Sequence, residues 1–99
     1  MDFSKLLSRA QELQDRMQHE LNDLVVEASA GGGMVQVRMN GMKQLLSIKL
    51  DREVVDPEDV ATLESLVLSA MNEASRQVDV ALKERIGSMA GGFQGLLGL

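Results

Sequence analysis

Hydrophobic residues near the N-terminus recur every three or four positions and predict a long amphipathic helix over residues 3–24. Asp2 is placed to cap its start, and neither glycine nor proline interrupts it. At ~1.5 Å per residue, such a helix is roughly 33 Å long. The apolar positions that define it are Phe3, Leu6, Leu7, Ala10, Leu13, Met17, Leu21 and Leu24.

After this helix the pattern changes to alternation and predicts three strands. The segments "LVVEASA", "MVQVRM" and "MKQLLSIKL" are separated by three glycines, 31–33, and by Asn40-Gly41. Asn-Gly between alternating runs is the strongest short-range hairpin signal, because a type I′ turn needs positive φ at both central residues. We therefore expect a three-stranded antiparallel meander with one apolar face.

The two turns also predict a register for each hairpin. If Asn40 and Gly41 form the second loop and Gly31 and Gly32 the first, the apolar residues share one face and Glu27 stays on the polar face. The expected pairs are Met39–Met42, Val37–Gln44, Val35–Leu46, Ala28–Val35 and Val26–Val37, with Arg38, Lys43 and Lys49 on the polar face.

A second long helix follows the strands. Asp56 suits the N-cap, Pro57 the first helical position, and the acidic residues after it suit the positive end of the helix dipole. One helix face is apolar to residue 82, and we expect the helix to end near Ser88. This pattern divides the chain into one domain, 1–89, and a flexible Gly/Leu-rich tail, 90–99. The apolar face holds Val60, Leu63, Leu66, Val67, Ala70, Met71, Ala74, Val78, Ala81 and Leu82.

Composition indicates that this domain associates with a copy of itself. A chain of 99 residues has a modest core, and with only two aromatic residues that core is built from aliphatic side chains and methionine. Both predicted helices are also longer than such a small sheet can cover, so their ends should project. No signal peptide or membrane-spanning stretch is visible, which leads us to expect a cytoplasmic protein without a membrane partner.

The glycines allow a second interpretation, a phosphate-binding loop, which the flanking residues disfavour. Such a loop needs Gly-Lys-Ser/Thr opening a helix, whereas Met34-Val35-Gln36 continues as a strand. The chain has no cysteine and one histidine, His19, on the polar side of the first helix. We therefore expect no enzyme activity, catalytic residue, cofactor, metal site or small-molecule substrate.

The distribution of basic residues leaves two readings open. Ten Lys and Arg against fifteen Asp and Glu give a net charge of −5, which by itself disfavours nucleic acid. A local stripe can carry the opposite sign, however, and three basic residues line one side of the first helix. They are either solvated surface positions or contacts for a phosphate backbone. The candidates are Lys5, Arg9 and Arg16 on the first helix, and Arg76, Lys83 and Arg85 on the second.

The order of elements and several segments resemble the YbaB/EbfC family of bacterial nucleoid-associated proteins. The matching segments are "SAGGGMVQVRMNG", "IKLD" and "LESLVLSAMNEA". The resemblance covers roughly residues 3–88, and the strand block with its two spaced turns is its most specific part.

This resemblance implies an α+β homodimer shaped like tweezers, whose helices bind double-stranded DNA without enzymatic activity. By position, the DNA-binding residues would be the six basic candidates above. The expected role is in nucleoid organisation or gene regulation, through backbone contacts in the cytoplasmic nucleoid. The alternative is a protein–protein interaction module that uses the apolar helix faces and the C-terminal leucines.

Overall fold

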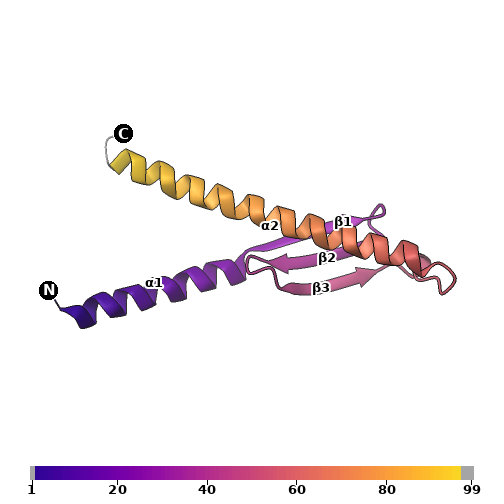
Figure 1. Cartoon of the computed structure of the whole chain (residues 1–99), viewed down its shortest axis with the longest axis horizontal. Coiled ribbons are helices and arrows are strands. Elements are labelled where there is room, and N and C mark those ends of the chain that lie inside the picture. The colour runs from indigo at the N-terminus through magenta and orange to yellow at the C-terminus, as the bar shows by residue number, and fades with distance from the viewer. Residues whose placement is uncertain (1, 97–99) are drawn as a thin grey trace.

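The structure confirms the predicted α+β order of helix, meander and helix (Figure 1). It is a computed structural model that describes residues 2–96, with the side chains of residues 2–85. The strands form one antiparallel sheet in the order β1-β2-β3. The elements are α1 (Phe3–Asp23), β1 (Val25–Ala30), β2 (Val35–Asn40), β3 (Leu45–Leu50), a 3-10 turn (Arg52–Val54) and α2 (Val60–Leu96).

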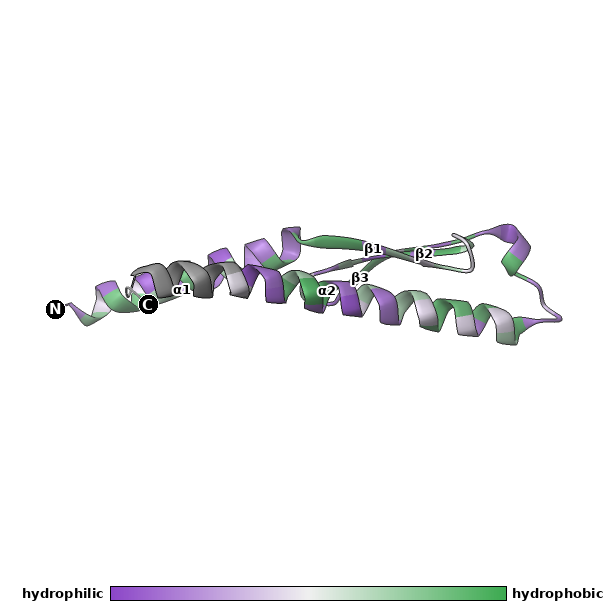
Figure 2. Ribbon diagram, turned by 90° about the horizontal axis from the view of Figure 1, so that it is seen from above, coloured by the Kyte–Doolittle hydropathy of each residue, from purple (hydrophilic) through white to green (hydrophobic). Residues whose placement is uncertain are grey.

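The first half of α2 packs on one face of the sheet and forms the core with β1 and β2 (Figure 2). Small and β-branched side chains at this contact let the helix lie close to the strands. Ala70, Ala74 and Val78 recur at a spacing of four and are fully buried, as the predicted apolar face requires. The other buried apolar residues are Ala28, Val35, Val37, Met39 and Val54.

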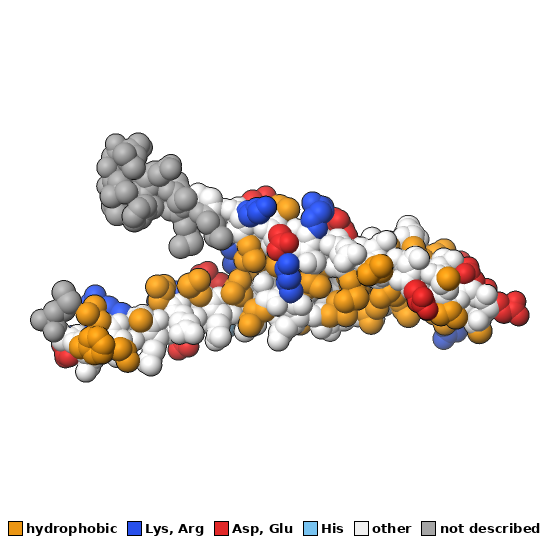
Figure 3. Space-filling view, viewed as in Figure 1, with side chains coloured by type: hydrophobic (Ala, Val, Ile, Leu, Met, Phe, Trp, Pro, Cys, Tyr) orange, Lys and Arg blue, Asp and Glu red, His pale blue; other side chains and the backbone are white. Residues whose placement is uncertain are grey.

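The same helix leaves β3 uncovered. Ile48 lies directly opposite Val37 and shares its face, yet Ile48 is 45% exposed while Val37 is 1% exposed. One helix about 10 Å wide covers roughly two strands spaced ~4.8 Å apart, so the third strand stays open. Figure 3 shows hydrophobic side chains gathered over this part of the sheet. The apolar residues exposed on β3 are Leu45, Leu46, Ile48 and Leu50.

Helix α1 stands away from the sheet. None of its residues is buried, and its main contacts with the sheet are with β2 and the turn that follows it. Asp2 caps it as predicted, accepting a 3.0 Å hydrogen bond from the amide of Ser4. Both α1 and the C-terminal half of α2 project from the same end of the sheet (Figure 1). We call α1 and residues 83–96 of α2 the two arms, and the remainder the body.

The triple glycine is the predicted hairpin turn. Gly31, Gly32 and Gly33 have φ values of 65°, 67° and 92°, which glycine adopts without steric cost. The predicted pairing was wrong by two residues, because the turn takes four residues, 31–34, and Ala30 pairs with Val35. A shift of two preserves the faces, so Ala28 still points into the core.

The second turn differs more from its prediction. Val35 pairs with Leu50 and Val37 with Ile48, and a bulge between Arg38 and Met39 shifts the register. Lys43 has a positive φ of 61°, whereas Gly41 is not among the positive-φ residues. The prediction of a type I′ turn was therefore wrong. The cause is Asn40, whose buried side chain accepts hydrogen bonds from the amides of Met42 (3.0 Å) and Gln44 (2.9 Å). This bonding organises a longer turn, residues 40–44.

The bounds of α2 also differ from those predicted. The helix starts at Val60 because Asp59, not Asp56, caps it, accepting a 3.3 Å hydrogen bond from the amide of Thr62. Asp56 instead accepts from the amide of Glu58, in the preceding turn. At the other end, the backbone stays helical to Leu96 rather than ending near Ser88. Residues 97–99 of the predicted tail lie outside the described residues.

Candidate nucleic-acid interface

The three basic residues of α1 lie on an exposed helix, away from any acidic partner among the described residues. Lys5, Arg9 and Arg16 are exposed, and none forms an ion pair with a described residue. Lys5 and Arg9 are one helical turn apart and share a shallow surface hollow with Glu12. Their charges are therefore available to an external anion, although Glu12 dilutes the positive potential beside them.

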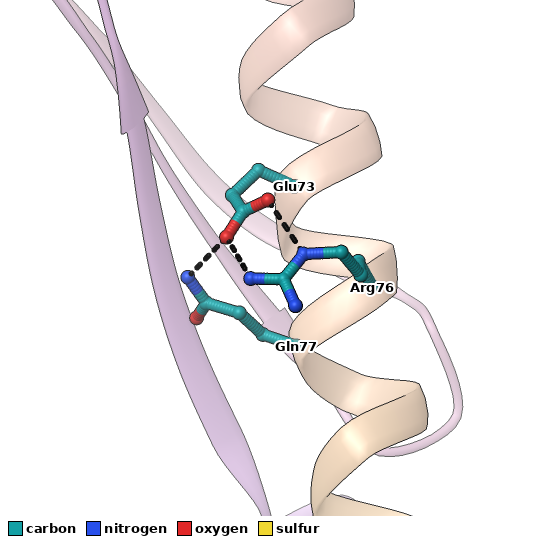
Figure 4. A network of polar contacts seen from close by, with 3 residues as sticks. All are labelled: Glu73, Arg76 and Gln77. Atoms are coloured by element: carbon teal, nitrogen blue, oxygen red, sulfur yellow. Dashed lines mark hydrogen bonds and ion pairs between the residues drawn. The ribbon is translucent and has the colours of Figure 1, made fainter.

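Arg76 on α2 is in a different state, because it is bound within its own helix (Figure 4). Its Nε and Nη2 donate hydrogen bonds of 2.9 and 2.5 Å to the two carboxylate oxygens of Glu73. Together with a weaker hydrogen bond from Gln77, this pairing lowers the pKa of Glu73 from 4.5 to about 2. The Glu73 carboxylate in turn raises the pKa of Arg76. Arg76 is therefore largely neutralised, a pairing that its i, i+3 spacing in the sequence already permitted.

Lys83 and Arg85 begin the second arm. Both are exposed, and neither forms an ion pair with a described residue. They follow Val78, which is fully buried, and Leu82, which packs at the edge of the core, so they lie where α2 leaves the sheet. Of the six candidates, five are thus unpaired on the arms, and Arg76 is paired on the body.

Two basic residues of the body are also engaged. Arg38 lies opposite Glu27 across the β1–β2 pair, with its Nε 3.4 Å from the Glu27 carboxylate. Lys43 was predicted on the polar face of the sheet, but its Nζ lies 3.0 Å from Asp79 of α2. The long second turn places Lys43 near that helix. Sequence periodicity did not reveal this contact, since it joins residues 36 positions apart.

Most of the negative charge lies away from the arms. Residues 51–59 carry five carboxylates and one arginine, Arg52, which is a net −4 out of the −5 of the chain. This segment joins β3 to α2 at the end of the sheet opposite the arms (Figures 1 and 3). Asp51, Asp56 and Asp59 each accept a hydrogen bond from a backbone amide there. The acidic total therefore arises mainly from turns and caps, and the remainder of the chain is nearly neutral.

The sheet face opposite α2 offers a polar hollow of about 450 Å³. The Glu27–Arg38 pair, Gln36, Ser47 and Lys49 line it. Among the side chains that the structure describes, no three His, Asp or Glu residues come together as a metal site. Within residues 2–96, neither helix has a segment apolar enough to cross a membrane. His19 lies on the surface of α1, with its Nε2 3.3 Å from Asp23.

Comparison with known proteins decides the family. The model of the YbaB/EbfC DNA-binding family matches residues 1–93. The chain belongs to this family. A nucleoid-associated protein of Koribacter versatilis is 45% identical to it over 92 residues, which is 93% of this chain and 91% of the relative. A nucleoid-associated protein of Chloroflexus aurantiacus is 42% identical, covering 97% of this chain and 99% of the relative.

A solved structure supports the fold of this YbaB/EbfC member. An uncharacterized protein from Helicobacter pylori superposes with a TM-score of 0.66 at 25% identity, covering 85% of this chain and 98% of the other. The family match and the bacterial relatives confirm the resemblance seen in the sequence. They identify a DNA-binding, nucleoid-associated family.

Proposed function

We propose that this YbaB/EbfC protein binds double-stranded DNA as a homodimer at the nucleoid in the cytoplasm, through backbone contacts from its two arms. The residues assigned to the contact are Lys5, Arg9, Arg16, Lys83 and Arg85, with Arg76 contributing once it leaves Glu73. The role is nucleoid organisation or gene regulation, without an enzymatic step, cofactor or small-molecule substrate.

The observation that carries this proposal is where the unpaired positive charge lies. Five of the six candidate cations are on the arms and have no acidic partner in the described part of the chain, while most of the net negative charge lies at the opposite end of the body. A phosphate backbone approaching the arms therefore avoids the acidic segment 51–59 and meets unpaired cations, although α1 itself also carries four carboxylates against its three cations. These cations lie on helix surfaces and not in a shaped pocket, which suits backbone contacts with little sequence preference.

The dimer is proposed from apolar surface that one chain leaves open. The face of β3 that continues the core is exposed, and so is the apolar stripe of α1. A second copy would cover both surfaces and remove them from water. Two copies would also present each arm twice, so contacts that are weak singly combine into useful affinity.

The test is a gel shift on random and defined duplexes over a series of salt concentrations. Each phosphate contact contributes a slope of about −0.9 to log affinity against log salt. Arg9→Ala with Arg16→Ala should weaken binding to all duplexes alike and flatten this slope by one unit or more. The matched control, Lys49→Ala with Arg52→Ala, removes the same charge from the body and should retain the slope.

Two results would overturn the proposal. Loss of binding in the control with retention in the arm variant would move the contact to the body. Absence of duplex binding by the wild type at low salt would favour the alternative, a protein–protein interaction module. The exposed apolar stripe of α1 suits that module, and its affinity would respond little to salt. The C-terminal leucines assigned to it fall where side chains are not described.

A further inference from the structure

The turn of residues 40–44 contacts both helices that carry the arms. On one side, the amide of Gly41 donates a 2.8 Å hydrogen bond to the carbonyl of Leu21, in the last turn of α1. On the other side, Nζ of Lys43 lies 3.0 Å from Asp79 of α2. Between these contacts, the side chain of Asn40 bonds to Met42 and Gln44 and holds the turn in one conformation.

We propose that this turn sets the angle between the two arms, with Gly41 and Lys43 as positioning residues; the consequence for DNA rests on the proposed function. Helix α1 has no buried residue, so little else fixes its direction. The last carbonyls of a helix lack partners within the helix, and Gly41 supplies one to Leu21. The hydrogen bond between Gly41 and Leu21 therefore anchors α1 at its C-terminal end only.

Gly41 is required for close approach and not for backbone conformation. Its φ is not positive, but a Cβ atom built there would lie 2.7 Å from the Leu21 carbonyl oxygen and 3.2 Å from its Cα. Since both of these are backbone atoms, relief requires α1 to move away from the turn. A helix of 21 residues multiplies a small movement at its base several-fold at its far end.

Lys43 differs from Gly41 because its backbone conformation, and not a close approach, is unusual for its residue type. Among the described residues it is the one non-glycine with positive φ, a conformation that glycine adopts more readily. A lysine in this position places its ammonium group on Asp79, which a glycine cannot do. Lys43→Gly should therefore relieve the backbone while releasing the turn from α2. Because this variant removes the contact with α2 without straining the turn, a change in arm geometry cannot be attributed to a destabilised turn.

The experiment measures arm geometry by the distance between two spin labels. The chain has no cysteine, so labels attach at Gln11→Cys on α1 and Glu84→Cys on α2, both exposed. Labelled chains are diluted into excess unlabelled chains, so that pulsed dipolar spectroscopy reports distances within one chain. Circular dichroism checks that each variant is folded.

Gly41→Ala should shift the distance distribution, and Lys43→Gly should broaden it. Gly32→Ala is the matched control, because it strains a turn at the other end of the sheet, where an added Cβ meets nothing within 4 Å. It should leave the distribution unchanged. Wild-type distributions in both Gly41→Ala and Lys43→Gly would overturn the proposal. If Gly41→Ala fails to fold, Lys43→Gly alone decides.

The same variants then connect arm geometry to DNA. Gly41→Ala should weaken duplex binding on the order of tenfold, because arms held at the wrong angle cannot engage together. Gly32→Ala should bind as the wild type does. The spin-label distances are recorded without DNA, so a wild type that fails to bind duplex would contradict the proposed function and leave the arm result standing. Altered distances with unchanged affinity would overturn the link to DNA.

Discussion

The amide of Gly41 lies 2.8 Å from the carbonyl oxygen of Leu21, so a backbone hydrogen bond joins the turn between β2 and β3 to the last turn of α1. The approach is close enough that a Cβ on residue 41 would lie 2.7 Å from that oxygen. The sequence also predicted that Gly41 forms part of this turn, but through a positive φ that it does not have. The physical reason for a glycine here is the distance to the helix.

Two glycine substitutions distinguish close approach from backbone conformation. Gly41→Ala should lower the free energy of unfolding by about 1–3 kcal/mol through overpacking, and Gly41→Val by more. Gly32→Ala should cost about 1 kcal/mol, since only its positive φ of 67° is strained. Denaturant unfolding at one protein concentration gives both values. A Gly41→Ala variant as stable as the wild type would show that the turn and helix separate freely.

The contrast between the two turns explains how far the sequence predicted the fold. Helix and strand positions followed from apolar periodicity, because burial of one face determines it. Pairing depends on the number of residues in each turn, and that number is set by side-chain hydrogen bonds such as those of Asn40. A two-residue error in the first hairpin kept the faces correct, so periodicity did not reveal it.

For the candidate site, the sequence identified which residues are basic but not which are free. The ion pair of Arg76 with Glu73 could have been predicted from the sequence, since a spacing of three places both residues on one helix surface. Lys43 and Asp79 could not, because their contact depends on the conformation of a turn and on its distance from α2. The uncovered face of β3 likewise follows from the width of one helix and not from any local pattern.

Asn40 should be the most sensitive polar residue of the body. It is 3% exposed, and Asn40→Ala removes the acceptor for two backbone amides. We expect a loss of about 2 kcal/mol or more in the free energy of unfolding. Gln44→Ala removes only the acceptor for Asn40 Nδ2 and should cost less. Equal losses in denaturant unfolding would mean that the turn is held by something other than the side-chain oxygen Oδ1 of Asn40.

Releasing Arg76 should strengthen DNA binding. Glu73→Gln removes the carboxylate that pairs with Arg76, so the guanidinium becomes available to phosphate. We expect duplex affinity to rise severalfold and the salt slope to steepen by up to about 0.9 per Arg76 recruited. Glu64→Gln makes the same charge change on an exposed position of α2 and is the control. If both variants gain equally, net charge and not Arg76 is responsible.

The same pair predicts a pH dependence. The pKa of Glu73 falls from 4.5 to about 2 in the folded protein, first through its hydrogen bond with Arg76. A carboxyl whose pKa is depressed on folding adds stability that is complete above about pH 4.5 and is lost as the pH falls toward 2. Carboxyl chemical shifts followed by NMR should give this midpoint, and Arg76→Ala should raise it. A midpoint near 4.5 in the wild type would mean that the pair does not persist in solution.

The last prediction concerns the uncovered face of β3, which we expect to be covered by a second copy. Ile48 shares the face of the buried Val37 but remains 45% exposed, while its neighbour Ser47 lines the hollow on the opposite face. Ile48→Asp places a carboxylate where a partner would bury it, which is costly without a compensating charge. Ser47→Asp adds the same charge one residue away, on the other face.

Sedimentation velocity at micromolar concentration should show a dimer for the wild type and for Ser47→Asp, and a monomer for Ile48→Asp. Dissociation by Ser47→Asp alone would place the interface on the polar face, and a monomeric wild type would remove the dimer altogether. The monomeric variant also tests why the dimer matters. If two sets of arms act together, Ile48→Asp should lose duplex affinity while every arm cation is still present, because bivalent binding requires both sets in one particle. Undiminished binding by that monomer would mean that each pair of arms binds DNA alone.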